Sequence, residues 1–134
     1  MTQQFTVQTR GGIQLVDITD RVESAVRESG VHSGVAHVFV THTTAGITIN
    51  ENADPSVRGD LVAALERAVP DDARYSHTEG NSPAHVKASL MGLCQTVLVE
   101  NGKLMLGTWQ GIYLCEFDGP RTRRVVVKIQ RDAP

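Results

Sequence analysis

The chain has 134 residues, 40% of them hydrophobic, which is the size and composition of one globular domain. Thirteen Lys and Arg against fifteen Asp and Glu give a net charge of −2, so no general basic field for nucleic acid exists. A (β/α)₈ barrel, at about 250 residues, and a membrane helix, at roughly eighteen apolar residues, are excluded. We expect a single soluble, cytoplasmic domain over residues 1–134 with no nucleic-acid or membrane partner.

Three helices are expected from their end signals. They should cover residues 20–29, 55–69 and 83–91. In the first, Asp20 and Glu23 have the spacing of a capping box, and Gly30 is a typical stop. Asp54 and Ser82 are each followed by Pro, which is typical of a cap and the first helical residue.

Strands are expected at both ends of the chain and between the first two helices. They should cover residues 5–10, 13–18, 34–41, 47–50, 93–100, 103–106, 111–118 and 123–130. The Gly11-Gly12 turn predicts that the first two form a hairpin, and the last four segments are expected to form a meander of three or four strands. Residues 112–115 are apolar on both faces, so their strand should be central or lie at a subunit interface.

This order of elements predicts an α+β fold with a mostly antiparallel β-sheet or sandwich and three helices. The two cysteines of the chain, Cys94 and Cys115, lie in apolar runs, and two cysteines are too few for a disulfide framework. We interpret both as reduced core residues.

The first candidate site segment is His42-Thr43-Thr44, directly after a buried strand, with residues 50–54 just beyond. Loops that leave a buried strand often carry functional side chains, because the strand holds them while solvent reaches them. The alternative is that the threonines bond local backbone and that His42 caps the strand.

The second segment brings His77, Asn81, Ser82 and His85 to the start of a helix. The first helical turn has unpaired N–H groups and a partial positive charge, which suit a phosphate or carboxylate. Together with His42, the two histidines would give a zinc-type set with an open position, although their spacing matches no standard motif. Alternatively, Asn81 and Ser82 only cap the helix and the histidines are solvated.

Two later segments complete the candidates. Glycines flank Trp109 and Gln110, which would let the backbone approach a ligand, although a lone Trp is more often a core residue. Asp118 lies in a turn, and Arg121 and Arg123 follow it. Guanidinium groups suit phosphate oxygens, but arginines also protect edge strands.

Four motifs together resemble the YjbQ-like family, whose members are often labelled secondary thiamine-phosphate synthases. The motifs are His42-Thr-Thr-Ala-Gly-Ile-Thr-Ile-Asn-Glu-Asn-Ala-Asp54, His77-x-Glu-Gly-Asn81-x-x-Ala-His85, Leu106-Gly-Thr-Trp-Gln-Gly-Ile112 and Glu116-Phe-Asp-Gly-Pro-Arg-x-Arg123. The resemblance implies a small α+β homotrimer whose motif histidines, acids and amides line a metal or anion site. It also implies a weak ability to replace thiamine-phosphate synthase.

We therefore expect one polar pocket. Its catalytic residues would be His42, Glu51, Asp54, His77 and His85. Its substrate- or anion-binding residues would be Thr43, Thr44, Asn50, Asn81, Ser82, Trp109, Gln110, Asp118, Arg121 and Arg123. The metal ligands would be His42, His77 and His85.

The expected reaction joins a pyrimidine-methyl diphosphate to a thiazole phosphate and expels diphosphate. Three imidazoles favour a zinc-like divalent ion, whereas Mg²⁺, which diphosphate chemistry normally uses, prefers oxygen ligands. This mismatch suggests a side activity of a site built for another small phosphorylated or anionic metabolite. The alternatives are a metal-dependent hydrolase of such a substrate and a trimer that binds a metabolite without turnover.

Overall fold

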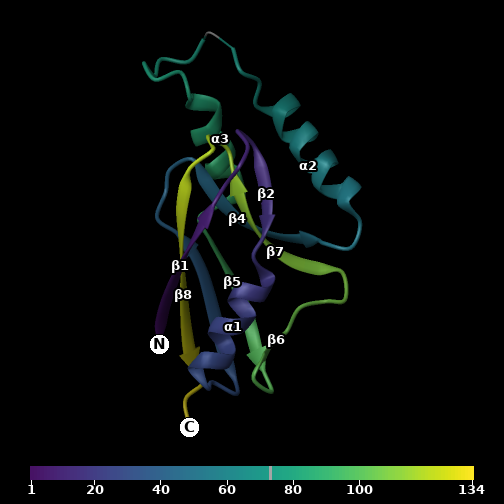
Figure 1. Cartoon of the computed structure of the whole chain (residues 1–134), viewed down its shortest axis with the longest axis vertical. Helices are drawn as coiled ribbons and strands as arrows, with labels where there is room; N and C mark the ends of the chain where they lie inside the picture. The colour runs from purple at the N-terminus through teal and green to yellow at the C-terminus, as the bar shows by residue number, and fades with distance from the viewer. Residues whose placement is uncertain (73) are drawn as a thin grey trace.

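The computed structural model describes residues 1–72 and 74–134, which form an α+β fold (Figure 1). In chain order the elements are β1 (Thr2–Gln8), β2 (Gln14–Asp17), α1 (Thr19–Ser29), β3 (Gly34–Val40), β4 (Ala45–Glu51), α2 (Pro55–Ala68), α3 (Ser82–Met91), β5 (Cys94–Glu100), β6 (Lys103–Leu104), β7 (Gln110–Glu116) and β8 (Thr122–Arg131). The expected α+β class with three helices is confirmed for the described residues.

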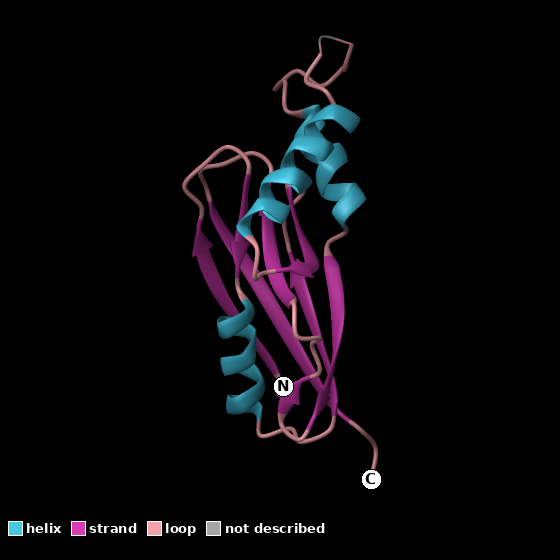
Figure 2. Ribbon diagram, turned by 90° about the vertical axis from the view of Figure 1, so that its right-hand side faces the viewer, coloured by secondary structure: helices cyan, strands magenta, loops and turns pink. Residues whose placement is uncertain are grey.

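The strands form two antiparallel sheets. The larger sheet has the order β1-β8-β3-β5-β6, and the smaller has the order β2-β7-β4. The main core lies between them and takes apolar side chains from both sheets and from α1. Val38, Val127 and Ile47 are fully buried in it. Helix α1 covers one end of this core, and α2 and α3 lie together at the other end (Figure 2).

The smaller sheet is buried on both of its faces. A second cluster, which includes Tyr113 and Cys115, packs against Ala84 and Ala88 of α3 and against half-buried leucines of α2. Because β7 is the middle strand between two cores, its side chains are apolar at both parities. The expectation that residues 112–115 are central is confirmed.

The predicted hairpin of residues 5–18 is wrong. Strand β1 pairs with β8 and β2 pairs with β7, so the two neighbours in sequence belong to different sheets. The chain leaving β1 is held instead by the bond from the Thr9 backbone N–H to the Arg121 carbonyl, at 2.9 Å. The Gly11-Gly12 signal predicted a turn but not which strand would pair with which.

The predicted C-terminal meander is correct only for its first two strands. Strands β5 and β6 pair through the turn at Asn101 and Gly102, whose φ angles are 54° and 72°, the left-handed values such a turn needs. Strand β7 joins the smaller sheet, and β8 lies between β1 and β3. The last two strands therefore pair with partners far away in the sequence.

Helix ends agree with the sequence signals in most cases. Gly30 ends α1 with φ 69°, and the Asp54 carboxylate accepts the Ser56 backbone N–H at 2.9 Å to begin α2. The expected capping box at Asp20 is wrong, because the helix already begins at Thr19. The Asp17 carboxylate accepts the Thr19 backbone N–H at 2.9 Å.

The second and third helices differ from expectation in detail. None of the residues of α2 is fully buried, so its apolar stripe covers the second cluster only in part. Helix α3 already includes Ser82, so Asn81 rather than Ser82 precedes it, while the predicted end at Gly92 is confirmed. The helices within the described ranges are all too short or too polar to cross a membrane.

The two cysteines occupy different environments. Cys115 is fully buried in β7, and burial raises the pKa of its thiol to about 12. Cys94 is free and exposed at the start of β5, so the expectation that it is a core residue is wrong. Its neighbours alternate between the two faces of the sheet, and Cys94 lies on the outer face, beside Phe39 of β3.

Candidate functional site

Nine of the residues singled out in the sequence line one open hollow of about 400 Å³, which we call the site hollow. They are His42, Thr43, Thr44, His77, Asn81, His85, Asp118, Arg121 and Arg123. Thr41 and Glu79 complete its lining. The lining residues surround the start of α3. Figure 1 shows that this helix lies at the end of the molecule opposite α1.

Three chain segments meet at the site hollow. The loop between β3 and β4 supplies residues 41–44, and the segment before α3 supplies residues 77–81. The turn between β7 and β8 supplies Asp118 and Arg121. Because β7 pairs with β4 along its whole length, with Glu116 opposite Ala45, and β8 pairs with β3, the antiparallel pairing brings these loops to the same end of the fold.

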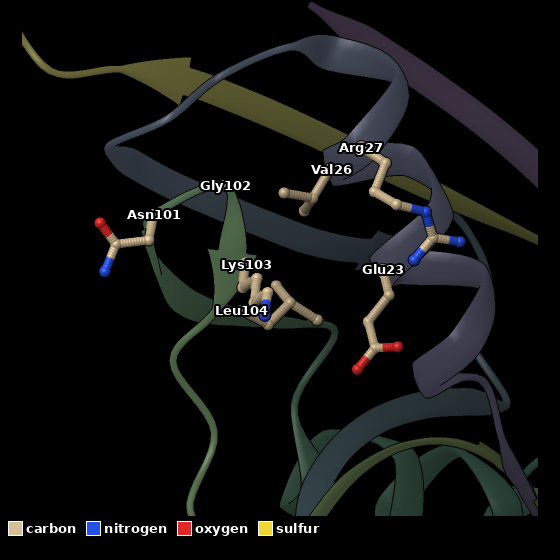
Figure 3. A pocket seen from close by; sticks show the side chains of 7 residues that line it. All are labelled: Glu23, Val26, Arg27, Asn101, Gly102, Lys103 and Leu104. Carbon is tan, nitrogen blue, oxygen red and sulfur yellow. The ribbon is translucent and has the colours of Figure 1, made fainter.

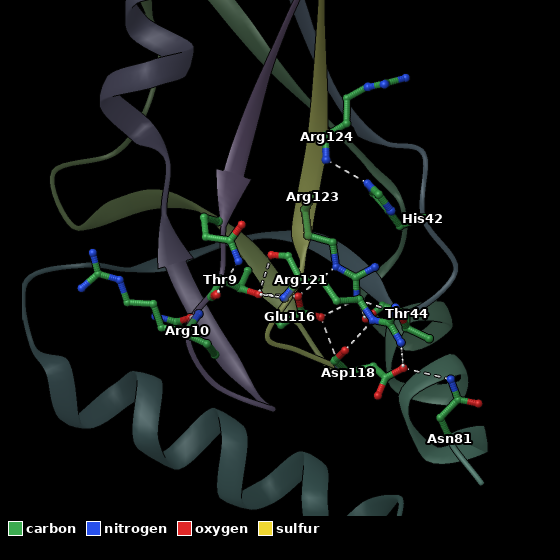
Figure 4. Close-up of polar contacts among 12 residues, drawn as sticks. Thr9, Arg10, His42, Thr44, Asn81, Glu116, Asp118, Arg121, Arg123 and Arg124 are labelled. Atoms are coloured by element: carbon green, nitrogen blue, oxygen red, sulfur yellow. Dashed lines mark hydrogen bonds and ion pairs between the residues drawn. The ribbon is translucent and has the colours of Figure 1, made fainter. Parts of the chain in front are cut away.

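A buried ion pair holds the β3–β4 loop to the β7–β8 turn (Figure 4). Glu116, fully buried, accepts from Nε of Arg123 at 2.9 Å and from a second guanidinium nitrogen of the same residue. It also accepts the Thr9 hydroxyl at 2.7 Å and the Asp118 backbone N–H at 3.0 Å. Arg123 in turn donates to the Thr44 hydroxyl at 2.7 Å. Four segments of the chain are thus fixed around one carboxylate.

Burial opposes the charged form of Glu116, but the hydrogen bonds from Arg123, Asp118 and Thr9 outweigh it and lower the pKa of this carboxyl. The pair therefore stays ionised in the folded protein. Arg123 lines the hollow with its guanidinium already engaged by Glu116 and Thr44, so it shapes the wall more than it offers a free charge.

A second ion pair lies at the rim of the hollow. The Arg121 guanidinium donates to the Asp118 carboxylate at 2.9 Å and to its backbone carbonyl at 2.7 Å. The Asn81 amide donates to the same carboxylate at 2.9 Å, which links the β7–β8 turn to the start of α3. Burial alone would raise the pKa of Asp118, but these two donors lower it. Arg121 is half-exposed, so it can also reach an anion in the hollow.

The orientation of His42 is set by the backbone of β8. Its Nε2 accepts the Arg124 backbone N–H at 2.8 Å (Figure 4). Burial, and then the charge of Arg123, lower the pKa of this imidazole, so the neutral ring is favoured. A neutral ring that accepts at Nε2 carries its proton on Nδ1, so His42 can donate a hydrogen bond from Nδ1.

The other two histidines, His77 and His85, lie next to each other in the lining of the site hollow. The rings of His77 and His85 are 5.4 Å apart between centroids and nearly perpendicular. Glu79 lies 3.9 Å from His77 Nε2. Sequence analysis missed Glu79, although it lies inside the quoted His77 motif. The role of Glu116 was not predicted either. The only sign of it in the sequence was that Glu116 begins the motif that ends at Arg123.

The arrangement of the histidines does not fit a ready three-imidazole metal centre. In residues 1–72 and 74–134, no three His, Cys, Asp or Glu side chains are grouped so that they would share an ion. His42 uses the lone pair of Nε2 to accept a backbone N–H, and its other nitrogen carries the proton. A zinc-like or magnesium cofactor stays a prediction.

Several predicted site residues lie elsewhere. Strand β4 leads from Ala45, beside the site hollow, to Glu51, which is about 20 Å away at the usual rise per strand residue. Asn50 and Asp54 lie at this far end too, and Asp54 caps α2. The expected single pocket containing all these residues is therefore not what the structure forms.

The Trp109 segment also lies at the far end of β4. Gln110 pairs with Glu51 and lines a separate polar hollow together with Asp17 and Asn52. Trp109 is 63% exposed and is not the core residue that a lone Trp more often is. Ser82 begins α3 but does not line the site hollow. A further hollow lies between α1 and the β5–β6 hairpin, near Arg27 and Lys103, and no histidine lines it (Figure 3).

Comparison with known proteins decides the family. The sequence profile described as "UPF0047 protein YjbQ-like" matches residues 3–132. The chain belongs to the YjbQ-like family. A UPF0047 protein of Methanocaldococcus jannaschii is 51% identical over 132 residues, which cover 98% of this chain and 96% of the relative. The Bacillus subtilis UPF0047 protein YugU is 48% identical over 130 residues, or 96% and 98% of the two chains.

Solved structures of the YjbQ-like family share the fold. A crystal structure from Clostridium acetobutylicum, described as a yjbq/upf0047 family protein, superposes with a TM-score of 0.94 at 57% identity, covering 96% of this chain and 99% of that one. A YbjQ-like protein from Sulfolobus solfataricus superposes with a TM-score of 0.94 at 35% identity, covering 98% and 97%. The family resemblance drawn from the motifs is confirmed.

Proposed function

We propose that this YjbQ-like protein binds a small phosphorylated metabolite in the site hollow and displaces diphosphate from it. The reaction would be the weak joining of a pyrimidine-methyl diphosphate to a thiazole phosphate. The observation that carries the proposal is that His42, His77, His85 and Arg121 line one open hollow. Each of these side chains can donate to phosphate oxygens.

The chemistry of this displacement matches what these side chains offer. The thiazole nitrogen forms a bond to the pyrimidine methylene carbon, and the bond from that carbon to the diphosphate oxygen breaks. The electron pair of the broken bond leaves with the diphosphate, so negative charge develops on it. Donors aimed at that oxygen stabilise the charge and contribute to rate. Arg121 and the imidazoles of His77 and His85 are among the donors in the hollow.

The charges of the hollow make the histidines important. Glu116 neutralises Arg123, and Asp118 neutralises Arg121. The His77 and His85 rings, which belong to neither of these pairs, are therefore the donors left for the phosphate groups. His42 is kept neutral by its surroundings and would act as a hydrogen-bond donor through Nδ1. It would orient the anion without adding charge.

We also propose that the protein is a homotrimer, as the family resemblance implies. Support comes from the outer face of the larger sheet, where Phe39 of β3 and Leu98 of β5 are 39% and 53% exposed on neighbouring strands. The two side chains lie toward opposite ends of the β3–β5 pairing, because Phe39 pairs with Cys94 and Leu98 pairs with Val35. Exposed apolar side chains on one sheet face are typical of an interface. Sedimentation analysis should give a mass three times that of the chain, and a monomer at all concentrations would contradict this proposal.

The test of function is a direct assay of the joined product. The purified protein is incubated with the pyrimidine-methyl diphosphate and the thiazole phosphate, and the product and released diphosphate are quantified. We expect a slow reaction that His85→Ala reduces at least tenfold. His32→Ala, a change of an exposed histidine outside the hollow, is the matched control and should leave the rate unchanged.

The same assay separates the alternative functions. Phosphate release from an ester panel without the joined product would identify a hydrolase. A rise in melting temperature with phosphorylated ligands but no product would identify a non-catalytic binder, because a ligand that binds only the folded state stabilises it. Either result would overturn the proposed transferase activity. Metal analysis of protein purified without chelator tests the expected zinc-like ion.

A further inference from the structure

A second hollow of about 460 Å³ adjoins the site hollow, and we call it the side hollow. Six residues line it: Thr43, His85, Ala88, Ser89, Gly92 and Leu93. Two of them, Thr43 and His85, also line the site hollow. A molecule that lies against His85 can therefore occupy both spaces at once.

The two hollows differ in chemistry. The site hollow is lined by ionised and hydrogen-bonding side chains, whereas none of the residues of the side hollow has a permanently charged side chain. Gly92 and Leu93 present mainly carbon, and Ala88 lies buried behind them. The Ser89 hydroxyl donates to the His85 backbone carbonyl at 3.0 Å, which uses its proton within the helix. The side hollow therefore favours an apolar group over one that needs several hydrogen bonds.

The floor of the side hollow is held in place by the sheets. The Gly92 carbonyl accepts the Ile47 backbone N–H at 3.0 Å, and the Leu93 carbonyl accepts the Val40 backbone N–H at 3.0 Å. Gly92 has φ 89°, which favours glycine at this bend. This anchoring to β3 and β4 means that the space is formed before a ligand arrives, which lowers the cost of binding.

We propose that the side hollow is the subsite for an apolar ring carried by the phosphorylated substrate. The inference rests on the proposed function and narrows its substrate class to phosphate esters of alcohols that bear a planar, largely apolar ring. The phosphate lies in the site hollow, the ring lies against Gly92 and Leu93, and His85 lies between the two. A sugar phosphate fits less well, because its hydroxyls would lose water without gaining partners.

Calorimetric binding of three probes tests this subsite. Inorganic phosphate reports the site hollow alone, phenyl phosphate reports both hollows, and ribose 5-phosphate reports a polar body. We expect phenyl phosphate to bind wild type roughly tenfold more tightly than the other two, because burial of a ring adds apolar contact.

Two tryptophan variants locate the ring. Ser89→Trp places a large side chain into the side hollow from an exposed helical position and should abolish the preference for phenyl phosphate. Leu90→Trp is the matched control, because Leu90 is 60% exposed on the same helix and does not line the hollow. It should keep the preference. Leu93→Asn should reduce the preference without adding bulk. Circular dichroism confirms that each variant is folded.

The outcomes separate this subsite from the proposed function. If inorganic phosphate binds wild type but phenyl phosphate binds no more tightly, the subsite is refuted while the phosphate site stands. The same conclusion follows if Ser89→Trp keeps the full preference. If neither probe binds wild type, the proposed function fails and the subsite fails with it.

Discussion

Replacing Glu116 by Gln should be among the most destabilising single changes in this protein. The substitution keeps the shape of the side chain but removes its charge, and the buried Arg123 guanidinium loses its counter-ion. Glu116 is fully buried and Arg123 is 3% exposed, so water cannot replace the lost partner. The new amide N–H group would also face the donors of Thr9 and Asp118 that the carboxylate now accepts.

The expected loss follows from known buried ion pairs. Removing one partner of such a pair costs about 3–5 kcal/mol of unfolding free energy. For a 134-residue chain this corresponds to a fall in melting temperature of about 11–18 °C, at roughly 2.1 cal/mol/K of unfolding entropy per residue. Replacing both residues with apolar ones, Glu116→Leu with Arg123→Met, should cost less than the single change, because no unpaired charge stays buried.

Urea unfolding followed by far-ultraviolet circular dichroism measures the loss, at one fixed protein concentration so that any self-association is constant. The control is Asp72→Asn, which breaks the exposed ion pair with Arg74 and should leave stability unchanged within error. A loss below about 1 kcal/mol for Glu116→Gln would refute the reasoning, since a dispensable counter-ion would mean that Arg123 finds another partner.

Three further changes test other parts of the fold. Gly34→Ala should lower the free energy of unfolding by about 3 kcal/mol, because the added Cβ would lie 1.9 Å from a backbone carbonyl oxygen of β8. Gly59→Ala, in open space on α2, should raise the free energy of unfolding by about 0.5–1 kcal/mol. Thermal melts of the two variants compare these effects. In the native protein a thiol reagent should titrate only Cys94, since the buried Cys115 thiol has a raised pKa, and two equivalents reacting without unfolding would contradict this. Because the pKa of Glu116 is lowered in the folded protein, its charge contributes to stability at pH values above the ordinary carboxyl pKa of 4.5. This contribution is lost as the pH falls through the pKa of the folded protein. Urea titrations over that pH range should show a flatter acid dependence of stability for Glu116→Gln.

The sequence predicts elements whose signals are local, and it fails where pairing depends on distant segments. Asp54-Pro55 and Gly30 marked helix ends correctly, because capping involves residues within one turn. Gly11-Gly12 marked a turn, but the strands on either side entered different sheets. The partners of β1 and β2 lie about a hundred residues away, and no local pattern encodes that choice.

The candidate site shows the same limit. Parts of three motifs far apart in sequence line one hollow, whereas the motif around Trp109 lies elsewhere. Residues 50–54 were grouped with His42 because they are close in sequence. A strand separates them, and an extended chain carries its two ends apart at about 3.3 Å per residue. Glu51 and Asp54 therefore lie at the opposite end of β4.

The central claim is that the site hollow binds phosphate groups through its arginine and histidine side chains. Calorimetric titration with inorganic diphosphate tests it most directly, using wild type, Arg121→Gln, His85→Ala and the control Arg27→Gln. Arg27 belongs to α1 and lines a different hollow. We predict that wild type and the control bind diphosphate equally and that the two site variants bind at least tenfold more weakly. Equal binding by all four proteins, or none by wild type, would contradict the claim.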